Sequence, residues 1–318
     1  MHQNGSHMQG KALLKPRLVY AAQQVVERET DAGSAAPTAA AATRSEAPLN
    51  GQQLGHYTVI RQLGQGGYAS IYLGVHHYLN TQVALKLLNL FLASDEDVKR
   101  FQMEARILAH LRHRHIVRVL DFGVERSTPF LAMEYAPGGD LQQYFPRGIA
   151  LPISTILPVV LQIASALQYV HNQSLIHCDV KPENMLLGPL HEVWLSDFGI
   201  ALTATAASNK QFRMHELQGS ANYMAPEQIN GSPFPASDQY ALAVMVYQWL
   251  CGQYLFQGTG LQVCLQHLST PPPRLRDRVL SIPHAVERVV LKALSKDPYQ
   301  RFAHVQEFAH ALKLASRY

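Results

Sequence analysis

The sequence predicts an α+β fold in which a small, mostly β unit precedes a larger, mostly helical one. Three observations carry this prediction. The 318 residues exceed what one hydrophobic core usually fills, so two core-bearing units are expected. Short β-branched and aromatic runs occupy the part before Gly138 and Gly139, and helical spacing dominates the part after them. We therefore expect a flexible tail over residues 1–53, a first lobe over 54–135 and a second lobe over 136–318.

The predicted tail differs in amino-acid composition from the rest of the chain. Residues 31–50 are rich in Ala, Thr and Ser and contain two prolines, Pro37 and Pro48. Such a segment buries too little apolar surface to offset the entropy of ordering it. Residues 18–28 have some helical spacing, but disorder is the interpretation that we favour there too.

The first lobe should contain short strands and one main helix. The helix is expected over residues 97–111, where Phe101, Ala105 and Leu108 recur at helical spacing. Asp95 and Glu96 lie near its start, where the helix dipole favours acids. The strands are expected at 57–60, 70–73, 82–86, 116–122 and 130–134.

The second lobe should be built from helices. They are expected at 153–173, 236–251, 260–267, 285–294 and 305–314. The most apolar run, 240–251, is shorter than the ~20 residues that a membrane helix needs, so we interpret it as a buried helix. The N-terminus lacks the apolar core and cleavage site of a secretory signal. We expect no membrane segment and a cytoplasmic location.

Charge and cysteine content exclude some partners. The chain has 27 Lys and Arg against 23 Asp and Glu, a scattered excess of +4 that does not indicate nucleic acid or a membrane surface. Cys178, Cys251 and Cys264 have no metal-ligand spacing and fit a reducing compartment better than a disulfide framework.

A glycine-rich turn, residues 64–69, joins two of the predicted strands. Glycine lets a backbone approach phosphate closely, although glycine-rich hairpins are also common without any ligand. A dinucleotide site would need the turn to open a helix, so that alternative fails. Lys86 follows on the next strand, directly after Val83-Ala84-Leu85, and Glu104 lies on the next helix. This order favours an ion pair that aims an ammonium group at phosphate oxygens.

Three later motifs complete the pattern. They are His177-Cys178-Asp179-Val180-Lys181-Pro182-Glu183-Asn184, Ser196-Asp197-Phe198-Gly199 and Ala225-Pro226-Glu227. Together with the glycine-rich turn, they resemble the signature set of the eukaryotic-type (Hanks-type) serine/threonine protein kinases, including bacterial members, from about residue 55 to 314. The resemblance implies a two-lobed kinase fold with a small antiparallel β N-lobe. It also implies transfer of the γ-phosphate of ATP, with Mg²⁺ or Mn²⁺, to Ser or Thr hydroxyls of protein substrates.

The resemblance assigns roles around the phosphates. Phosphoryl transfer builds charge on oxygens, so catalysis depends on positioning and neutralisation. Lys86 would hold the α- and β-phosphates, and Glu104 would orient Lys86. Asn184 and Asp197 would hold the metal.

The acceptor side follows from the same resemblance. Asp179 would accept the proton of the attacking hydroxyl or orient it, and Lys181 would neutralise the transferred phosphate. Lys181 also favours Ser or Thr as acceptor, and Ser220 would bridge Asp179 and Lys181. Glu183 would favour a basic residue ahead of the acceptor, although glutamate is common at this position.

The nucleotide itself should lie between the lobes. Apolar side chains would hold the base from above and below, backbone groups of 134–136 would bind its edge, and Asp140 would reach the ribose. The full expected set is Leu63, Gly64, Gly66, Gly67, Ile71, Ala84, Lys86, Met133, Glu134, Ala136, Asp140 and Leu186.

One residue departs from the family pattern. Cys178 stands where the family has an arginine that pairs with a phosphate on the activation loop. We therefore expect activity to depend little on phosphorylation of Thr203, Thr205 or Ser208. We interpret Cys178 as a structural residue rather than a redox switch. Elsewhere, Glu227 should pair with Arg301, and Asp238 should support the catalytic segment.

Other functions remain alternatives. A pseudokinase is one, but Lys86, Glu104, Asp179, Asn184 and Asp197 are all present. A small-molecule phosphotransferase is another, but Ser220, the Ala-Pro-Glu segment and Arg301 belong to the peptide-binding type. Catalysis that serves autophosphorylation is a third, with acceptors in the tail at Thr30, Ser34, Thr38, Thr43 and Ser45.

Overall fold

The computed structural model of the chain describes residues 49–66, 69–89, 95–198, 202–203 and 220–317, without the side chains of Arg100, Leu202, Thr203 and Ser220. Of the expected tail, residues 1–48 lie outside this description. One folded unit begins at Leu49, whose side chain packs under the first strands, a few residues before the boundary expected at 53/54.

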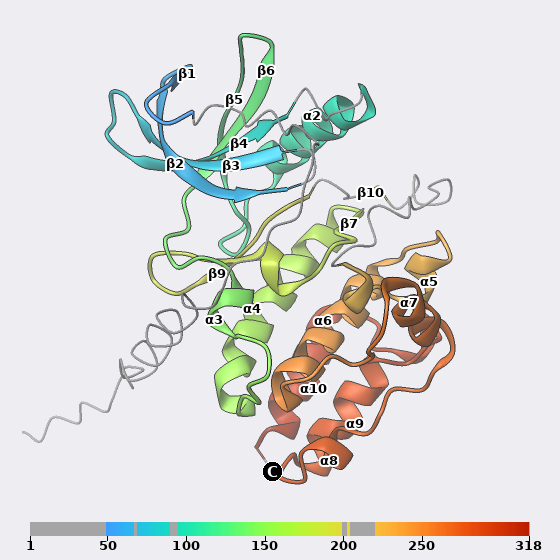
Figure 1. Ribbon diagram of the computed structural model, residues 1–318. Coiled ribbons are helices and arrows are strands. Elements are labelled where there is room, and N and C mark those ends of the chain that lie inside the picture. The colour runs from blue at the N-terminus through green and yellow to red at the C-terminus, as the bar shows by residue number, and fades with distance from the viewer. Residues whose placement is uncertain (1–48, 67–68, 90–94, 199–201, 204–219, 318) are drawn as a thin grey trace, which may run out of the picture. The chain divides into compact units, whose positions relative to one another are not determined.

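A six-stranded antiparallel sheet forms the first lobe (Figure 1). Its order is β1-β2-β3-β4-β6-β5. The bounds are β1 Gln53–Leu54, β2 Tyr57–Gln65, β3 Ala69–His76, β4 Gln82–Leu88, β5 Val119–Glu125 and β6 Thr128–Glu134. The glycine-rich turn joins β2 to β3, where Gly64 pairs with Ile71 and Gln65 with Ser70, so the predicted strand-to-strand connection is confirmed.

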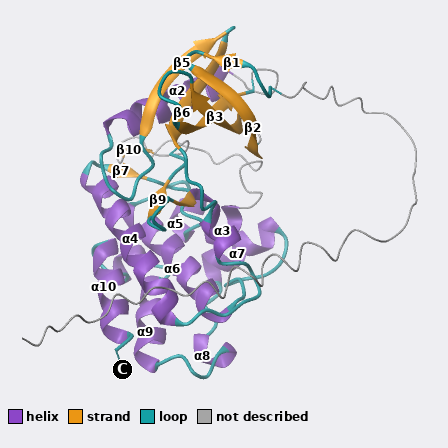
Figure 2. Ribbon diagram, turned by 90° about the vertical axis from the view of Figure 1, so that its left-hand side faces the viewer, coloured by secondary structure: helices purple, strands orange, loops and turns teal. Residues whose placement is uncertain are grey.

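Helix α2, Asp95–His110, lies against this sheet (Figures 1 and 2). Its first turn contains three acids, which the helix dipole favours. Phe101, Ala105 and Leu108 are buried at the predicted helical spacing and belong to the main hydrophobic core. Glu104 is buried beside them. Burial of this apolar side fixes the rotation of α2 and hence the direction of the Glu104 side chain.

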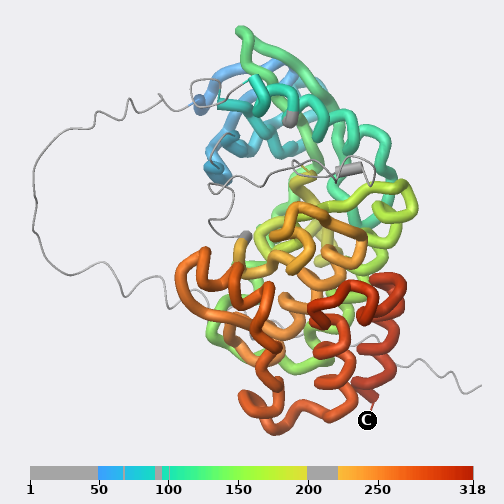
Figure 3. Tube along the Cα trace, turned by 90° about the vertical axis from the view of Figure 1, so that its right-hand side faces the viewer, coloured from blue at the N-terminus to red at the C-terminus, as the bar shows by residue number. Residues whose placement is uncertain are grey.

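The second lobe is mostly helical, as predicted (Figures 2 and 3). Its helices are α3 Leu141–Tyr144, α4 Ile153–Asn172, α5 Pro226–Ile229, α6 Pro235–Cys251, α7 Gly260–Ser269, α8 Leu275–Arg278, α9 His284–Ala293 and α10 Val305–Ala315. Short 3₁₀ helices are η3 Pro182–Asn184, η6 Ser220–Tyr223 and η7 Pro298–Gln300. Every residue of α6 from Ser237 onward is buried, so this helix is the centre of the lobe.

Helix α4 corrects the expectation that 240–251 is the most apolar run. An 18-residue window of this 20-residue helix has a mean hydropathy of 1.6, so the helix is long and apolar enough to cross a membrane. Eight of them are nevertheless buried in the protein core, where α4 packs against α6 and α10. The apolar character therefore fits a central helix of a folded domain.

Two small sheets were not predicted. Strand β8, Met185–Leu187, pairs with β9, Val193–Leu195, and β7, Leu175–Ile176, pairs with β10, Leu202–Thr203. Residues 115–117 bond to β9, since the Val117 N–H donates to the Leu195 carbonyl at 2.9 Å. This explains why β5 begins at Val119 rather than at the expected 116. Strands β7 and β8 hold both ends of residues 177–184.

Candidate active site

Lys86 on β4 is the centre of a three-residue ion cluster. Its Nζ donates to both carboxylate oxygens of Glu104 at 2.8 Å and to Asp197 Oδ1 at 2.6 Å. The Lys86 and Glu104 side chains are 12% and 3% exposed, whereas the Asp197 side chain is 44% exposed. The predicted Lys86–Glu104 pair is present, and Asp197 lies beside it from a segment more than a hundred residues away.

The charges of this cluster depend on one another. Burial alone would lower the pKa of Lys86, but the carboxylates of Asp197 and Glu104 outweigh it and raise that pKa. The Lys86 ammonium lowers the pKa of Asp197, against the effect of burial. For Glu104, burial raises the pKa, and Lys86 opposes that rise. A buried cation thus stays charged next to a carboxylate that stays ionised.

Residues 177–184, the catalytic loop, bring three predicted residues together. Asp179 Oδ2 accepts from Lys181 Nζ and from Asn184 Nδ2, each at 2.8 Å. Asn184 also donates to the Asp179 carbonyl at 2.9 Å, so its amide oxygen is left as the group that could face a cation. The loop lies next to the Lys86 cluster, because the His177 ring packs against Phe198, the residue after Asp197, with centroids 4.7 Å apart.

Asp238 on α6 holds the start of the catalytic loop through its backbone. Its carboxylate accepts from the backbone N–H groups of His177 and Cys178, each at 2.9 Å, and from His171 Nε2 at 2.7 Å. Burial would raise the pKa of Asp238, but the hydrogen bond and charge of His171 and the nearby His177 lower it. The predicted supporting role of Asp238 is confirmed.

Two residues of the site adopt left-handed backbone conformations. Cys178 has φ of 65° and Asp197 has φ of 66°. For residues other than glycine, such conformations cost about 1–3 kcal/mol and are often found at functional sites. Around Cys178 the surroundings fix the conformation, because Gln228 Nε2 donates to its carbonyl at 2.6 Å. The buried Cys178 side chain agrees with the structural interpretation.

Phe198 and Ser196 fix Asp197 from both sides. Phe198 is 1% exposed, and its ring packs edge-on against His177, with centroids 4.7 Å apart. The Ser196 N–H and hydroxyl donate to the Asn184 carbonyl at 2.9 and 3.0 Å. These contacts keep the backbone at Asn184 next to the backbone that precedes Asp197, so the two expected metal ligands are held near each other.

The expected walls of the nucleotide site share one hydrophobic core. Ala84 and Met133 are buried in it, and Ile71, Ala136 and Leu186 pack against it. Ala84 on β4 pairs with Met133 on β6, while Leu186 comes from β8 of the other lobe. These expected side chains therefore belong to one core that extends through both lobes, and Ala84 and Met133 are direct neighbours in it.

The polar groups expected to bind the nucleotide differ in whether they already have hydrogen-bond partners. The Glu134 N–H donates to the Arg118 carbonyl at 2.9 Å, so it is occupied. In the described part of the chain, the Ala136 N–H has no hydrogen-bond partner. Asp140 caps α3 and accepts twice from Gln143 at 2.8 Å, so a ribose would have to share its oxygens.

The hairpin residues complete the predicted set. Leu63 and Gly64 are half-buried on β2. The exposed Gly66 donates from its N–H to the Ala69 carbonyl at 2.8 Å. Gly67 lies outside the described residues, as do the side chain of Ser220 and the candidate phosphorylation sites Thr205 and Ser208.

The expected Glu227–Arg301 pair is confirmed. Arg301 Nη1 and Nη2 donate to the two Glu227 oxygens at 2.7 and 2.8 Å, and the guanidinium is fully buried. Arg301 also donates to the carbonyls of Ser295, Ala236 and Lys296. This bidentate pair ties the segment that follows η6 to the end of the lobe.

Several supporting residues were not found from the sequence. His171, Gln228 and Arg147 all contact the catalytic loop or its anchor. His171 lies at the end of a helix and Arg147 in a loop before α4, so neither stands in a motif. Only the three-dimensional arrangement reveals them.

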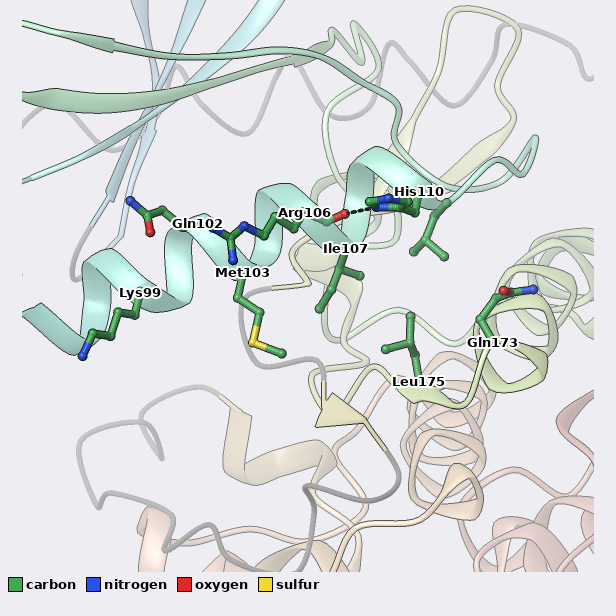
Figure 4. Close-up of a pocket in the computed structure, with 9 residues that line it drawn as sticks. Lys99, Gln102, Met103, Arg106, Ile107, His110, Gln173 and Leu175 are labelled. Atoms are coloured by element: carbon green, nitrogen blue, oxygen red, sulfur yellow. Dashed lines mark hydrogen bonds between the residues drawn. The ribbon is translucent and has the colours of Figure 1, made fainter.

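A hollow of about 600 Å³ lies apart from these residues (Figure 4). Its apolar floor includes Met103 and Ile107 from α2, which face Leu175 of β7. The basic residues Lys99, Arg106 and His110 border it. None of the predicted nucleotide or catalytic residues lines this hollow, so it is not the predicted site.

The donor set fits a magnesium ion held mainly by its nucleotide. Within the described ranges, no group of three His, Cys, Asp or Glu side chains is placed to hold a metal. Mg²⁺ in phosphotransfer sites commonly takes one or two protein oxygens and completes its shell with phosphates and water. Asn184 and Asp197 would supply those oxygens.

Comparison with known proteins defines the class. The protein kinase domain matches residues 57–312, so the chain belongs to the protein kinase family. The predicted fold class and family are thereby confirmed.

Three relatives show where in the family it falls. The chain is 33% identical to the serine/threonine-protein kinase PrkC of Bacillus subtilis, over 82% of the chain and 40% of PrkC. It is 35% identical to the serine/threonine-protein kinase Pkn1 of Myxococcus xanthus, over 89% of the chain and 41% of Pkn1. For the serine/threonine-protein kinase PknF of Mycobacterium tuberculosis, the values are 36%, 82% and 56%. The chain thus spans about half or less of the length of these relatives.

Proposed function

We propose that this chain is an active serine/threonine protein kinase that uses ATP and Mg²⁺. The observation that carries the proposal is the convergence of Lys86, Glu104 and Asp197, with contacts of 2.6–2.8 Å, next to the catalytic loop. A catalytically dead relative would be expected to lack one of these groups. The names of the relatives support serine and threonine as acceptors.

The chain's own residues suit the steps of phosphoryl transfer. ATP with its metal supplies the phosphoryl group and the neutralising charge when it is bound. Lys86 holds phosphate oxygens while Glu104 keeps the ammonium directed, which requires Lys86 to exchange its contact with Asp197. Asn184 and Asp197 offer oxygens to the metal. Each of these roles is electrostatic positioning, which provides most of the rate enhancement in such reactions.

Asp179 is the residue that acts on the acceptor hydroxyl. Its Oδ2 already accepts from Lys181 and Asn184, so the carboxylate has a fixed orientation before substrate arrives. Asp179 orients the hydroxyl and takes its proton, and the Lys181 ammonium stabilises charge on the transferred group. The pre-set orientation avoids reorganisation during the reaction.

The test measures phosphate transfer to a generic basic protein in the presence of ATP and Mg²⁺. We expect incorporation on Ser or Thr, a loss of at least about a hundredfold in the Asp197→Asn variant, and no transfer to aminoglycosides. Nucleotide binding, followed by the thermal shift that ATP produces with and without Mg²⁺, gives a second readout. ATP binding without any transfer would instead support a pseudokinase.

Autophosphorylation is part of the proposal. Mass spectrometry after incubation with ATP and Mg²⁺ should detect phosphate on one or more of Thr30, Ser34, Thr38, Thr43 and Ser45. An unmodified tail in an active preparation would remove this part of the proposal and leave the rest standing.

A further inference from the structure

Arg147 lies in the connection between α3 and α4 and is held by three side chains. Its Nη2 donates to Glu183 Oε1 at 3.2 Å, and its Nε donates to Gln142 Oε1 at 3.1 Å. The guanidinium carbon also lies over the ring of Tyr254, 5.0 Å from its centroid. The side chain is nevertheless 53% exposed. Arg147 is therefore an ordered cation at the surface rather than a buried structural one.

Glu183 belongs to the catalytic loop. It lies in η3 between Lys181 and Asn184, both of which donate to the Asp179 carboxylate. One Glu183 oxygen meets Arg147, and the other is buried without a hydrogen-bond partner among the described residues. A carboxylate in this state gains from any cation that approaches it.

Two tyrosines complete the surroundings. Tyr223 of η6 packs edge-on against Tyr254, with centroids 6.3 Å apart. Burial raises the pKa of the Tyr223 hydroxyl, and the Glu183 charge raises it further. The cluster of Arg147, Glu183, Tyr223 and Tyr254 thus joins the catalytic loop to η6, whose first residue is Ser220. Glu183 lies in the same short loop as Asp179, so a substrate chain whose hydroxyl meets Asp179 would come close to this cluster.

The charge balance of the cluster then decides which substrates fit. An unpaired Glu183 would attract a basic residue ahead of the acceptor, as expected from the sequence. Arg147 already supplies that cation within the chain and would be displaced or repelled by a second one. We propose that Arg147 is a specificity-determining residue: it neutralises Glu183, so that the enzyme does not select substrates with a basic residue ahead of the acceptor. This inference rests on the proposed function and deepens it.

The experiment compares two serine peptides that differ only in two residues ahead of the acceptor, which are Arg in one and Ala in the other. For the intact chain, the ratio of their kcat/KM values should be within about threefold of one. In Arg147→Ala the ratio should shift about five- to tenfold toward the Arg peptide. Arg147→Lys, which restores a cation, should return the ratio to that of the intact chain. The double variant Arg147→Ala with Glu183→Gln should lose the new preference.

Binding provides a readout that does not require catalysis. The same peptides, with Ala at the acceptor position and a fluorophore, are titrated in the presence of ADP and Mg²⁺. Arg147→Ala should bind the Arg peptide more tightly than the intact chain does and leave the Ala peptide unchanged. An unchanged preference in Arg147→Ala, or a strong preference for the Arg peptide in the intact chain, would overturn the inference. If no peptide is phosphorylated but the binding shift occurs, the proposed function fails, whereas the effect of Arg147 on peptide binding is retained.

Discussion

Glu104 shows how one side chain sets the position of another. It is 3% exposed and makes two 2.8 Å contacts with Lys86, whose ammonium also donates to Asp197. Glu104→Gln removes the charge with little change in shape, so Lys86 should turn toward Asp197. We expect kcat/KM to fall about ten- to a hundredfold, as for a small misplacement of a catalytic group. The exposed Glu307→Gln is the matched control and should leave kcat/KM unchanged.

Cys178 bears on regulation at the residue scale. Its backbone is fixed by Asp238 and Gln228, and its buried side chain has no positive charge with which to bind a phosphate. The variant with Thr203, Thr205 and Ser208 all changed to Ala should therefore keep most of its activity toward a protein substrate. Initial rates of the intact and triple-alanine proteins, measured side by side, test this. A tenfold or greater loss would show that phosphorylation there does matter.

At the scale of elements, sequence motifs predicted the site better than they predicted what supports it. Lys86, Glu104, Asp179, Asn184 and Asp197 stand in motifs whose chemistry is local, so their types and order were sufficient. Strands β8 and β9 have only three residues each, too few for a periodic signal. Arg147 and His171 act through contacts far along the chain. No local pattern marks such contacts, and the structure was needed to find them.

The Glu227–Arg301 pair connects α5 to the loop after α9. Because the guanidinium is fully buried and bonds to Glu227 at 2.7 and 2.8 Å, Arg301→Met would leave a buried carboxylate without its partner. We expect the free energy of unfolding to fall by about 3–5 kcal/mol, measured by urea denaturation. Arg288 on α9 is exposed, so Arg288→Met is the control and should change stability by less than about 0.5 kcal/mol. Equal effects of the two changes would show that the buried pair does not stabilise the lobe.

At the scale of the whole molecule, a buried histidine connects α7 to the segment before α5. His267 is 0% exposed. Its Nε2 lies 3.1 Å from the Asn222 carbonyl, which can only accept, so Nε2 carries the hydrogen and Nδ1 accepts from the Tyr240 hydroxyl at 3.0 Å. The neutral ring thus satisfies both contacts. Burial, helped by the nearby Lys296 ammonium, lowers the pKa of His267 to about 3.

This arrangement predicts that acid weakens the fold. Between its lowered folded pKa and the ordinary histidine value of about 6.5, His267 binds a proton in the unfolded chain but not in the folded one. Its contribution to stability is therefore complete above about pH 6.5 and declines as the pH falls toward about 3. Going from about pH 7 to about pH 5.5 should cost the intact chain about 1 kcal/mol more than it costs His267→Gln, which keeps a donor and an acceptor but does not titrate. Urea denaturation of both proteins at the two pH values measures this difference. Equal losses in both would mean that His267 takes up its proton in the folded protein as readily as in the unfolded chain, and that the α7 contact does not depend on its neutral form.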